Sequence, residues 1–104
     1  MHNSRRTTLA LAAAIGLLGG QALAADDELG AYLAETCASC HRADVRNGPI
    51  PSVVGLDEAR FISLMRAYRS GERPDSIMQA VARSLTDEET AALAHFLATR
   101  GDQQ

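Results

Sequence analysis

Apolar residues after residue 25 recur at the three- and four-residue spacing of amphipathic helices, and no segment there alternates as a strand does. The pattern predicts about four helices. Their expected bounds are about Asp27 to Cys40, Asp57 to Arg69, Asp75 to Ser84, and Thr86 to Arg100. We therefore expect an all-α fold in one small domain.

Each expected helix has one apolar side. The apolar positions are Gly30, Leu33, Ala34 and Cys37; Phe61, Leu64, Met65 and Tyr68; Ile77, Val81 and Leu85, flanked by Met78; and Ala92, Leu93, Phe96 and Leu97. Glycine within a helix costs about 1 kcal/mol relative to alanine. We therefore expect another helix to cross close to Gly30, with Phe96 beside it. Simple tolerance of the glycine is the alternative.

The breaks between the helices are marked by proline, glycine and capping residues. Pro49 and Pro51 preclude a helix in the segment that contains them. Gly71 is placed to end the second helix. Thr86 and Glu89 form a capping box at the start of the last helix, because each side chain can bind the backbone N–H of the other residue.

The N-terminal segment has the features of an export signal. The basic pair Arg5-Arg6 precedes an apolar run, and Ala22-Leu23-Ala24 is a cleavage site with small residues at both ends. We expect removal of residues 1–24, which leaves residues 25–104 as the domain in the periplasm. The run is shorter than the about 20 residues that span a bilayer, so we expect no stable membrane insertion of the mature chain. An uncleaved anchor is the alternative.

Cys37, Cys40 and His41 form the pattern Cys-x-x-Cys-His, the attachment signature of a c-type haem. Two thiols at this spacing add across the two vinyl groups of the porphyrin, and the adjacent imidazole reaches the iron from the same side. In a helical turn these residues stand at i, i+3 and i+4 and face one way. The motif occurs once. The sequence therefore predicts one covalently bound haem c, with His41 as the proximal iron ligand.

Other uses of the two cysteines fit less well. A structural zinc site takes about four ligands, and the only histidine after the motif is His95. A thioredoxin-like dithiol accompanies a strand–helix pattern, which is absent here. A disulfide across so small a loop would constrain the unfolded chain little, and it would leave His41 unexplained.

Composition agrees with a cofactor-centred, acidic domain. Residues 25–104 hold eight Arg, no Lys and thirteen Asp or Glu, a formal net charge of −5. Nucleic-acid binding is disfavoured, because phosphate contacts need a basic face. A domain of this size has a marginal core, and its aromatic residues are two Tyr and two Phe. A covalently bound macrocycle would supply apolar mass to that core.

The second axial position on the iron has three candidate ligands, Met65, Met78 and His95. Met65 lies within an apolar stripe, where a core methionine is expected. His95 lies off the apolar stripe of its helix and is expected at the surface. Met78 lies near a helix start, where a side chain can point across a cofactor. We favour Met78. A thioether opposite an imidazole raises the haem reduction potential and leaves no open position on the iron.

Several stretches besides the haem motif carry a family resemblance. They are Pro51-Ser52-Val53-Val54-Gly55, Ala67-Tyr68-Arg69-Ser70-Gly71-Glu72-Arg73-Pro74, Ile77-Met78 and Leu85-Thr86-Asp87-Glu88-Glu89. Over residues 29–99 the chain resembles the class I cytochromes c, and within them the haem domains of the cytochrome subunits of sulfide dehydrogenase (flavocytochrome c). The resemblance implies the small class I cytochrome c fold, with about four helices packed around one covalently bound haem c.

The resemblance also implies residue roles and partners. Met78 matches the methionine ligand of the family. Pro51 matches the proline whose carbonyl accepts a hydrogen bond from the proximal histidine, here His41. Pro49 is the alternative, and either proline could serve only to stiffen the loop. The implied partners are redox proteins, among them a sulfide-oxidising flavoprotein subunit. Some members of the subgroup carry two haem domains, whereas this chain has one motif.

The arginines around the second helix are further candidates. Arg66, Arg69 and Arg73 could pair with a haem propionate or line a docking surface, and a solvated face is the alternative. Tyr68 could bind a propionate or lie in the core.

The predicted function is electron transfer through a His/Met-ligated haem, as the cytochrome subunit or acceptor of a sulfide-oxidising flavoprotein. One alternative is a general soluble carrier to a terminal oxidase or another redox enzyme. The other is a sensor or enzyme with an open haem site, which would need Met78 to be displaced or merely a core residue. We assign no catalytic residue.

Overall fold

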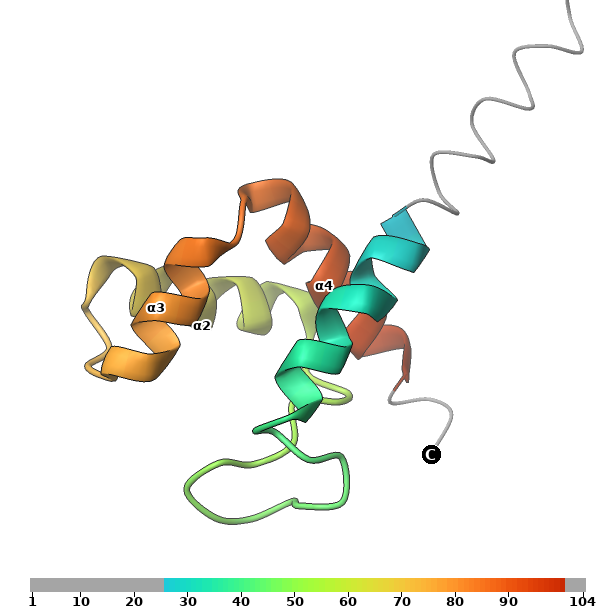
Figure 1. The fold of residues 1–104 in the computed structure, drawn as a ribbon, viewed down its shortest axis with the longest axis horizontal. Helices are drawn as coiled ribbons and strands as arrows, with labels where there is room; N and C mark the ends of the chain where they lie inside the picture. Colours follow the sequence, from blue (N-terminus) through green and yellow to red (C-terminus); the bar gives the residue numbers. More distant parts are fainter. Residues whose placement is uncertain (1–25, 101–104) are drawn as a thin grey trace, which may run out of the picture.

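The computed structural model describes residues 26–100, which form four helices and no strand (Figure 1). The first helix occupies residues 26–38 of this part. The others are α2 (Glu58–Ser70), α3 (Ser76–Ser84) and α4 (Asp87–Arg100). The all-α prediction is confirmed. The predicted signal peptide, residues 1–24, lies outside the described residues, as does Gly101.

The first helix packs closely against α4 at Gly30. A Cβ atom built on Gly30 would lie 2.6 Å from the Ala92 carbonyl oxygen and 2.7 Å from the Phe96 Cβ. The two backbones can approach this closely because glycine has no side chain. The expected proximity of Gly30 and Phe96 is therefore confirmed, and Figure 1 shows the first helix crossing α4.

Helix α2 packs against both α3 and α4 and buries Phe61 and Met65. The Asp57 carboxylate accepts a hydrogen bond from the Arg60 N–H at 3.1 Å at the start of the helix. Gly71 follows its end with φ 81°, in the left-handed region that glycine adopts readily. The boundary predicted from glycine is correct.

Helix α3 is short and begins at an aspartate cap. Asp75 Oδ1 accepts hydrogen bonds from the N–H groups of Ile77 at 3.0 Å and Met78 at 2.9 Å. The expected apolar side of this helix was partly wrong, because Ile77 is 72% exposed. The side that meets the core consists of Met78, Val81, Ala82 and Leu85. These positions follow i, i+3, i+4 and i+7, and Ile77 lies about 100° away from Met78 around the helix.

Helix α4 begins with the predicted capping box. The Thr86 hydroxyl accepts from the Glu89 N–H at 3.1 Å, and the Glu89 carboxylate accepts from the Thr86 N–H at 2.9 Å. Leu93 and Ala94 are fully buried, and Leu97 is nearly so. Phe96 is only half-buried and packs at the margin of the core.

The segment between the first helix and α2 is irregular, as its two prolines predicted. In Figure 1 it projects as a loop below the first helix. The Gly55 N–H donates to the Leu97 carbonyl at 2.9 Å. This bond attaches the C-terminal part of the loop to the last turn of α4. The Ser52 N–H donates to the Val45 carbonyl at 2.6 Å across the loop.

Candidate functional site

The turn that ends the first helix brings Cys37, Cys40 and His41 together. The helix ends at residue 38, two residues earlier than expected. The N–H groups of Cys40 and His41 nevertheless both donate to the Cys37 carbonyl, at 3.2 Å and 2.7 Å. The Ser39 hydroxyl donates to the Thr36 carbonyl at 2.7 Å and closes the same turn. These bonds keep the three residues in one helical turn, the arrangement that the haem motif requires.

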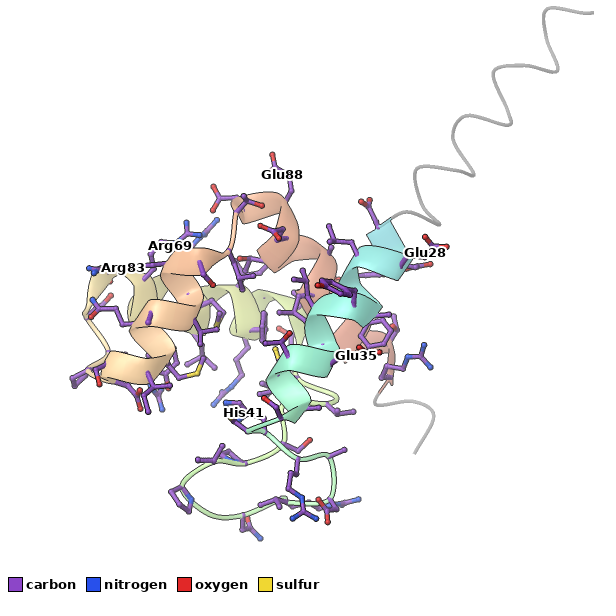
Figure 2. The ribbon with its side chains drawn as sticks, viewed as in Figure 1. Glu28, Glu35, His41, Arg69, Arg83 and Glu88 are labelled. Carbon is purple, nitrogen blue, oxygen red and sulfur yellow. The ribbon has the colours of Figure 1, made fainter. Side chains whose placement is uncertain are left out.

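The His41 ring is held by the loop that follows it. Its Nδ1 lies 2.7 Å from the Pro51 carbonyl oxygen. A carbonyl can only accept, so Nδ1 carries the proton and Nε2 keeps its lone pair. A neutral imidazole with this tautomer is a nitrogen ligand for iron. Figure 2 shows His41 between the first helix and the loop. The contact is made by Pro51 and not by Pro49.

Cys37 and Cys40 are not joined to each other by a disulfide. Cys40 is exposed, whereas Cys37 is half-buried against the hydrophobic core. Burial is the main cause that raises the pKa of the Cys37 thiol, and the neighbouring Cys40 adds to this. A thioether forms when a thiol adds across a vinyl group, so these two side chains are the ones that would attach a porphyrin.

The three candidates for the second iron ligand lie in different environments. Met65 is 6% exposed in the core, and the His95 Nδ1 lies 2.8 Å from the Glu58 carboxylate at the surface. The expectations for both are confirmed. Met78 lies in the first turn of α3, half-buried at the margin of the core. Of the three side chains, only that of Met78 is both partly accessible and without a hydrogen-bond partner in the part of the chain described; its backbone N–H is bound to Asp75.

The residues around these groups fit a haem. Twelve apolar or weakly polar side chains pack against the core while remaining partly exposed, and they come from all four helices and the loop. They are Leu33, Ala34, Cys37, Val53, Val54, Leu56, Ile62, Tyr68, Met78, Val81, Leu85 and Phe96. The donor set of two thiols, one imidazole nitrogen and one thioether is the set that a covalently bound, six-coordinate haem uses. Cys37 and Cys40 would hold the porphyrin, and His41 and Met78 would hold the iron.

The arginines of α2 and of the turn after it have separate surroundings. The Arg73 guanidinium lies 5.3 Å from the centre of the Tyr68 ring, a cation–π contact. Arg69 binds Asp87 and two backbone carbonyls, those of Ala82 and Leu85. The solvated-face alternative is therefore wrong for Arg69. Sequence reasoning missed these contacts, and the only available signal was a basic residue in the last turn of a helix.

A family model described as cytochrome c matches residues 28–101. The chain belongs to the cytochrome c family. The family match and the Cys-x-x-Cys-His motif together identify it as a class I cytochrome c, which carries a c-type haem and transfers electrons.

Two relatives are similar to this cytochrome c. One is a "thiosulfate dehydrogenase electron acceptor" from Stutzerimonas stutzeri (strain A1501), 39% identical over 67 residues. The match covers 62% of this chain and 31% of the relative, so the chain spans about a third of that protein. The other is "cytochrome c-553" from Helicobacter pylori (strain ATCC 700392 / 26695), 33% identical over 70 residues, with 64% of this chain and 73% of the relative covered.

Among residues 26–100, no helix of this cytochrome c combines the length and the apolar character needed to cross a membrane.

Proposed function

We propose that this chain is a periplasmic carrier of single electrons that takes electrons from a dehydrogenase of inorganic sulfur compounds. One haem c is attached through Cys37 and Cys40, and its iron is held between His41 and Met78. Residues 1–24 direct export and are removed, which leaves residues 25–104 as the working protein.

The observation that carries the proposal is the hydrogen bond between His41 and Pro51. The 2.7 Å contact fixes the tautomer and the direction of the imidazole and leaves Nε2 for the iron. The two cysteines lie in the same turn, because the Cys40 N–H donates to the Cys37 carbonyl at 3.2 Å. The two attachment points for the porphyrin, Cys37 and Cys40, and the oriented iron ligand, His41, thus all lie on one short segment.

Met78 supports an electron-carrying role over a catalytic one. Its backbone N–H is bound to Asp75 at 2.9 Å, so the start of α3 holds the residue in place. When bound, the haem supplies an iron that changes oxidation state by one electron. With His41 and Met78 both holding it, that iron would have no position for a substrate, and the thioether would raise its reduction potential. The chain's own contribution is to hold both ligands still, so that the change of oxidation state needs little rearrangement.

A sulfur-compound dehydrogenase is the electron donor that two likenesses of this chain favour. The resemblance in the Ala67–Pro74 stretch is to the cytochrome subunits of sulfide dehydrogenase. The Stutzerimonas relative is named as an electron acceptor of thiosulfate dehydrogenase. Both enzymes oxidise reduced inorganic sulfur, and both need an acceptor of single electrons. The formal charge of −5 on residues 25–104 favours a basic docking patch on that donor.

The test of the haem assignment uses protein matured with its export signal in a host that attaches haem. Mass spectrometry should show one haem added to residues 25–104, and acidified organic solvent should leave the colour on the polypeptide. The oxidised protein should show a sulfur-to-iron absorption band, and the reduced protein should bind carbon monoxide slowly. Met78→Ala should remove the band, lower the reduction potential and allow rapid carbon monoxide binding.

Met65→Leu is the matched control, because it removes the other methionine sulfur of the domain from the core. It should keep the band. Loss of the band in Met65→Leu with its retention in Met78→Ala would reject Met78 as the ligand. Rapid carbon monoxide binding by the unaltered protein would instead indicate an open-site sensor or enzyme.

The donor is tested separately by stopped-flow reduction of the purified cytochrome. A thiosulfate dehydrogenase and a sulfide-oxidising flavoprotein are each supplied with their substrate. Rapid reduction by either enzyme, slowed by added salt, supports the proposal. Failure of both to reduce it faster than the substrates do alone would remove the sulfur-compound assignment and leave a general carrier.

A further inference from the structure

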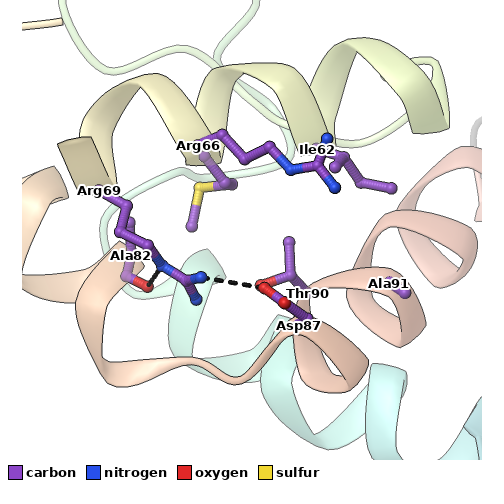
Figure 3. Close-up of a pocket in the computed structure, with 8 residues that line it drawn as sticks. Ile62, Arg66, Arg69, Ala82, Asp87, Thr90 and Ala91 are labelled. Carbon is purple, nitrogen blue, oxygen red and sulfur yellow. Dashed lines mark hydrogen bonds and ion pairs between the residues drawn. The ribbon is translucent and has the colours of Figure 1, made fainter. Parts of the chain in front are cut away.

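One side chain, Arg69, joins the ends of three helices. It lies in the last turn of α2, and its Nε donates to the Ala82 carbonyl of α3 at 3.4 Å. Its Nη2 donates to the carbonyl of Leu85, the residue that caps α3. Its Nη1 lies 2.9 Å from the carboxylate of Asp87, in the first turn of α4. Arg69 lines a cavity of about 90 Å³ together with residues of α2, α3 and α4. Figure 3 shows the residues that line it.

The guanidinium suits this position. The last carbonyls of a helix have no partner within the helix, and a cation near them is favoured by the helix dipole. A guanidinium offers five donors in a fixed plane, so it can bind two carbonyls and a carboxylate at once. A return contact runs from the Arg83 Nε to the Arg69 carbonyl at 3.3 Å. The end of α2 and the end of α3 are thus bound in both directions.

Helix α3 depends on such contacts because it has only nine residues. A helix of this length is not stable by itself, and its place is set by what it packs against. Its first turn is capped by Asp75, and its last turn is bound by Arg69. The segment between these two attachments contains Met78.

Met78 and Ala82 are one helical turn apart, on the same side of α3. Ala82 is 2% exposed and belongs to the hydrophobic core, so α3 packs against the core at this residue. Arg69 donates a hydrogen bond to the carbonyl of Ala82, this buried residue. A shift of the end of α3 away from α2 would therefore move Met78 with it, because the helix behaves as a rigid element over one turn.

We infer that Arg69 is a positioning residue for Met78. By holding the C-terminal end of α3 against α2, it fixes the place of the Met78 sulfur and opposes its displacement from the iron. The inference rests on the proposed role of Met78 as the iron ligand. It assigns Arg69 a role other than pairing with a haem propionate.

The test measures how well added imidazole competes with the Met78 sulfur for the iron of the oxidised haem protein. Loss of the sulfur-to-iron band is followed as imidazole is added to the unaltered protein and to Arg69→Ala. The variant should reach half displacement at an imidazole concentration lower by about tenfold, since it loses at least one charged hydrogen bond that holds α3. Circular dichroism of both proteins establishes that the helices remain folded.

Arg66→Ala is the matched control. Arg66 lies one turn earlier on α2, carries the same charge and lines the same cavity. In Figure 3 no dashed line joins it to another of the residues drawn. Its removal should change the imidazole midpoint by less than about twofold. A change in Arg69→Ala no larger than that in Arg66→Ala would overturn the inference.

Two further variants separate the contacts of Arg69. Asp87→Asn removes the exposed carboxylate charge but leaves both carbonyl contacts, and it should behave like the unaltered protein within about twofold. An effect as large as that of Arg69→Ala would overturn the assignment to α3. If Arg69→Ala fails to fold, Arg69→Lys takes its place, because lysine keeps the charge but lacks the planar fork. An unchanged midpoint in Arg69→Lys would also overturn the inference.

Failure of this inference and failure of the proposed function give different results. If the band survives in Met78→Ala, the ligand assignment is wrong and the role of Arg69 is rejected with it. If Met78→Ala loses the band while Arg69→Ala leaves the imidazole midpoint unchanged, only the positioning role is rejected.

Discussion

The Nδ1 atom of His41 lies 2.7 Å from the carbonyl oxygen of Pro51, ten residues further along the chain. The loop between them is closed by the bond from the Ser52 N–H to the Val45 carbonyl at 2.6 Å. A proline at position 51 fixes its own φ angle and so limits how far this part of the loop can move. The orientation of the imidazole is therefore set by the backbone of the loop.

Replacing Pro51 by alanine should raise the reduction potential. The carbonyl remains in Pro51→Ala, but the loop is less restricted and the hydrogen bond weakens. A weaker bond at Nδ1 makes the imidazole a poorer donor, which disfavours the oxidised iron. The measurement is a spectroscopic redox titration of the matured protein. Pro49→Ala is the control, and it should shift the potential less. A downward shift in Pro51→Ala, or an equal shift in both variants, would contradict this role of the bond.

Replacing Gly30 by alanine should destabilise the protein, although alanine is ordinarily better than glycine in a helix by about 1 kcal/mol. The added Cβ would lie 2.6 Å from the Ala92 carbonyl oxygen, which is backbone and cannot rotate away. The first helix and α4 must then separate, at a cost of about 1–3 kcal/mol. Denaturant unfolding of the haem protein measures the change.

Gly48→Ala is the comparison for this prediction. Gly48 has φ 129° and no atom within 4 Å of the added Cβ, so its cost comes from backbone strain alone. That cost is about 1–3 kcal/mol and should leave the contact between the two helices intact. A gain in stability for Gly30→Ala would show that the helices are not tightly packed at this point.

Much of the fold could be predicted from local patterns. Helix starts and ends follow from residues that act on their immediate neighbours, such as Thr86 with Glu89 and the glycine at position 71. The close crossing at Gly30 was also predictable, because glycine inside a helix is unfavourable unless something needs the space. The pairing of His41 with Pro51 required the family resemblance, since spacing by itself did not choose between Pro49 and Pro51.

The remainder depends on contacts that the side-chain pattern does not contain. The apolar pattern places Ile77 on the core side of α3 because it is large and apolar, yet small Ala82 is the buried residue of this helix. Burial on so short a helix is decided by how closely it meets α2, and a small residue permits the closest approach. Arg69 binds backbone carbonyls 13 and 16 residues away, and every residue has a carbonyl. No sequence pattern therefore marks its targets.

Removing the capping threonine should lower stability by about 1 kcal/mol. Thr86→Ala deletes the acceptor that binds the Glu89 N–H at 3.1 Å and leaves that donor to solvent. Denaturant unfolding again measures the loss. Thr99→Ala is the control, because the Thr99 hydroxyl donates only to carbonyls of its own helix, at 3.1 Å and 3.0 Å. It should change stability by less than about 0.5 kcal/mol, and equal losses would argue against a capping role for Thr86.

The two sides of α3 should respond differently to the same polar substitution. Ile77 is 72% exposed, so Ile77→Ser removes little buried apolar area and should change stability by less than about 0.5 kcal/mol. Val81 is half-buried against the core, and Val81→Ser should cost about 1–2 kcal/mol. Serine has the same helix propensity in both, so the difference reports burial. Thermal unfolding of the haem protein measures both variants. A loss for Ile77→Ser as large as that for Val81→Ser would place Ile77 against the core or the haem and would restore the apolar side first expected for this helix.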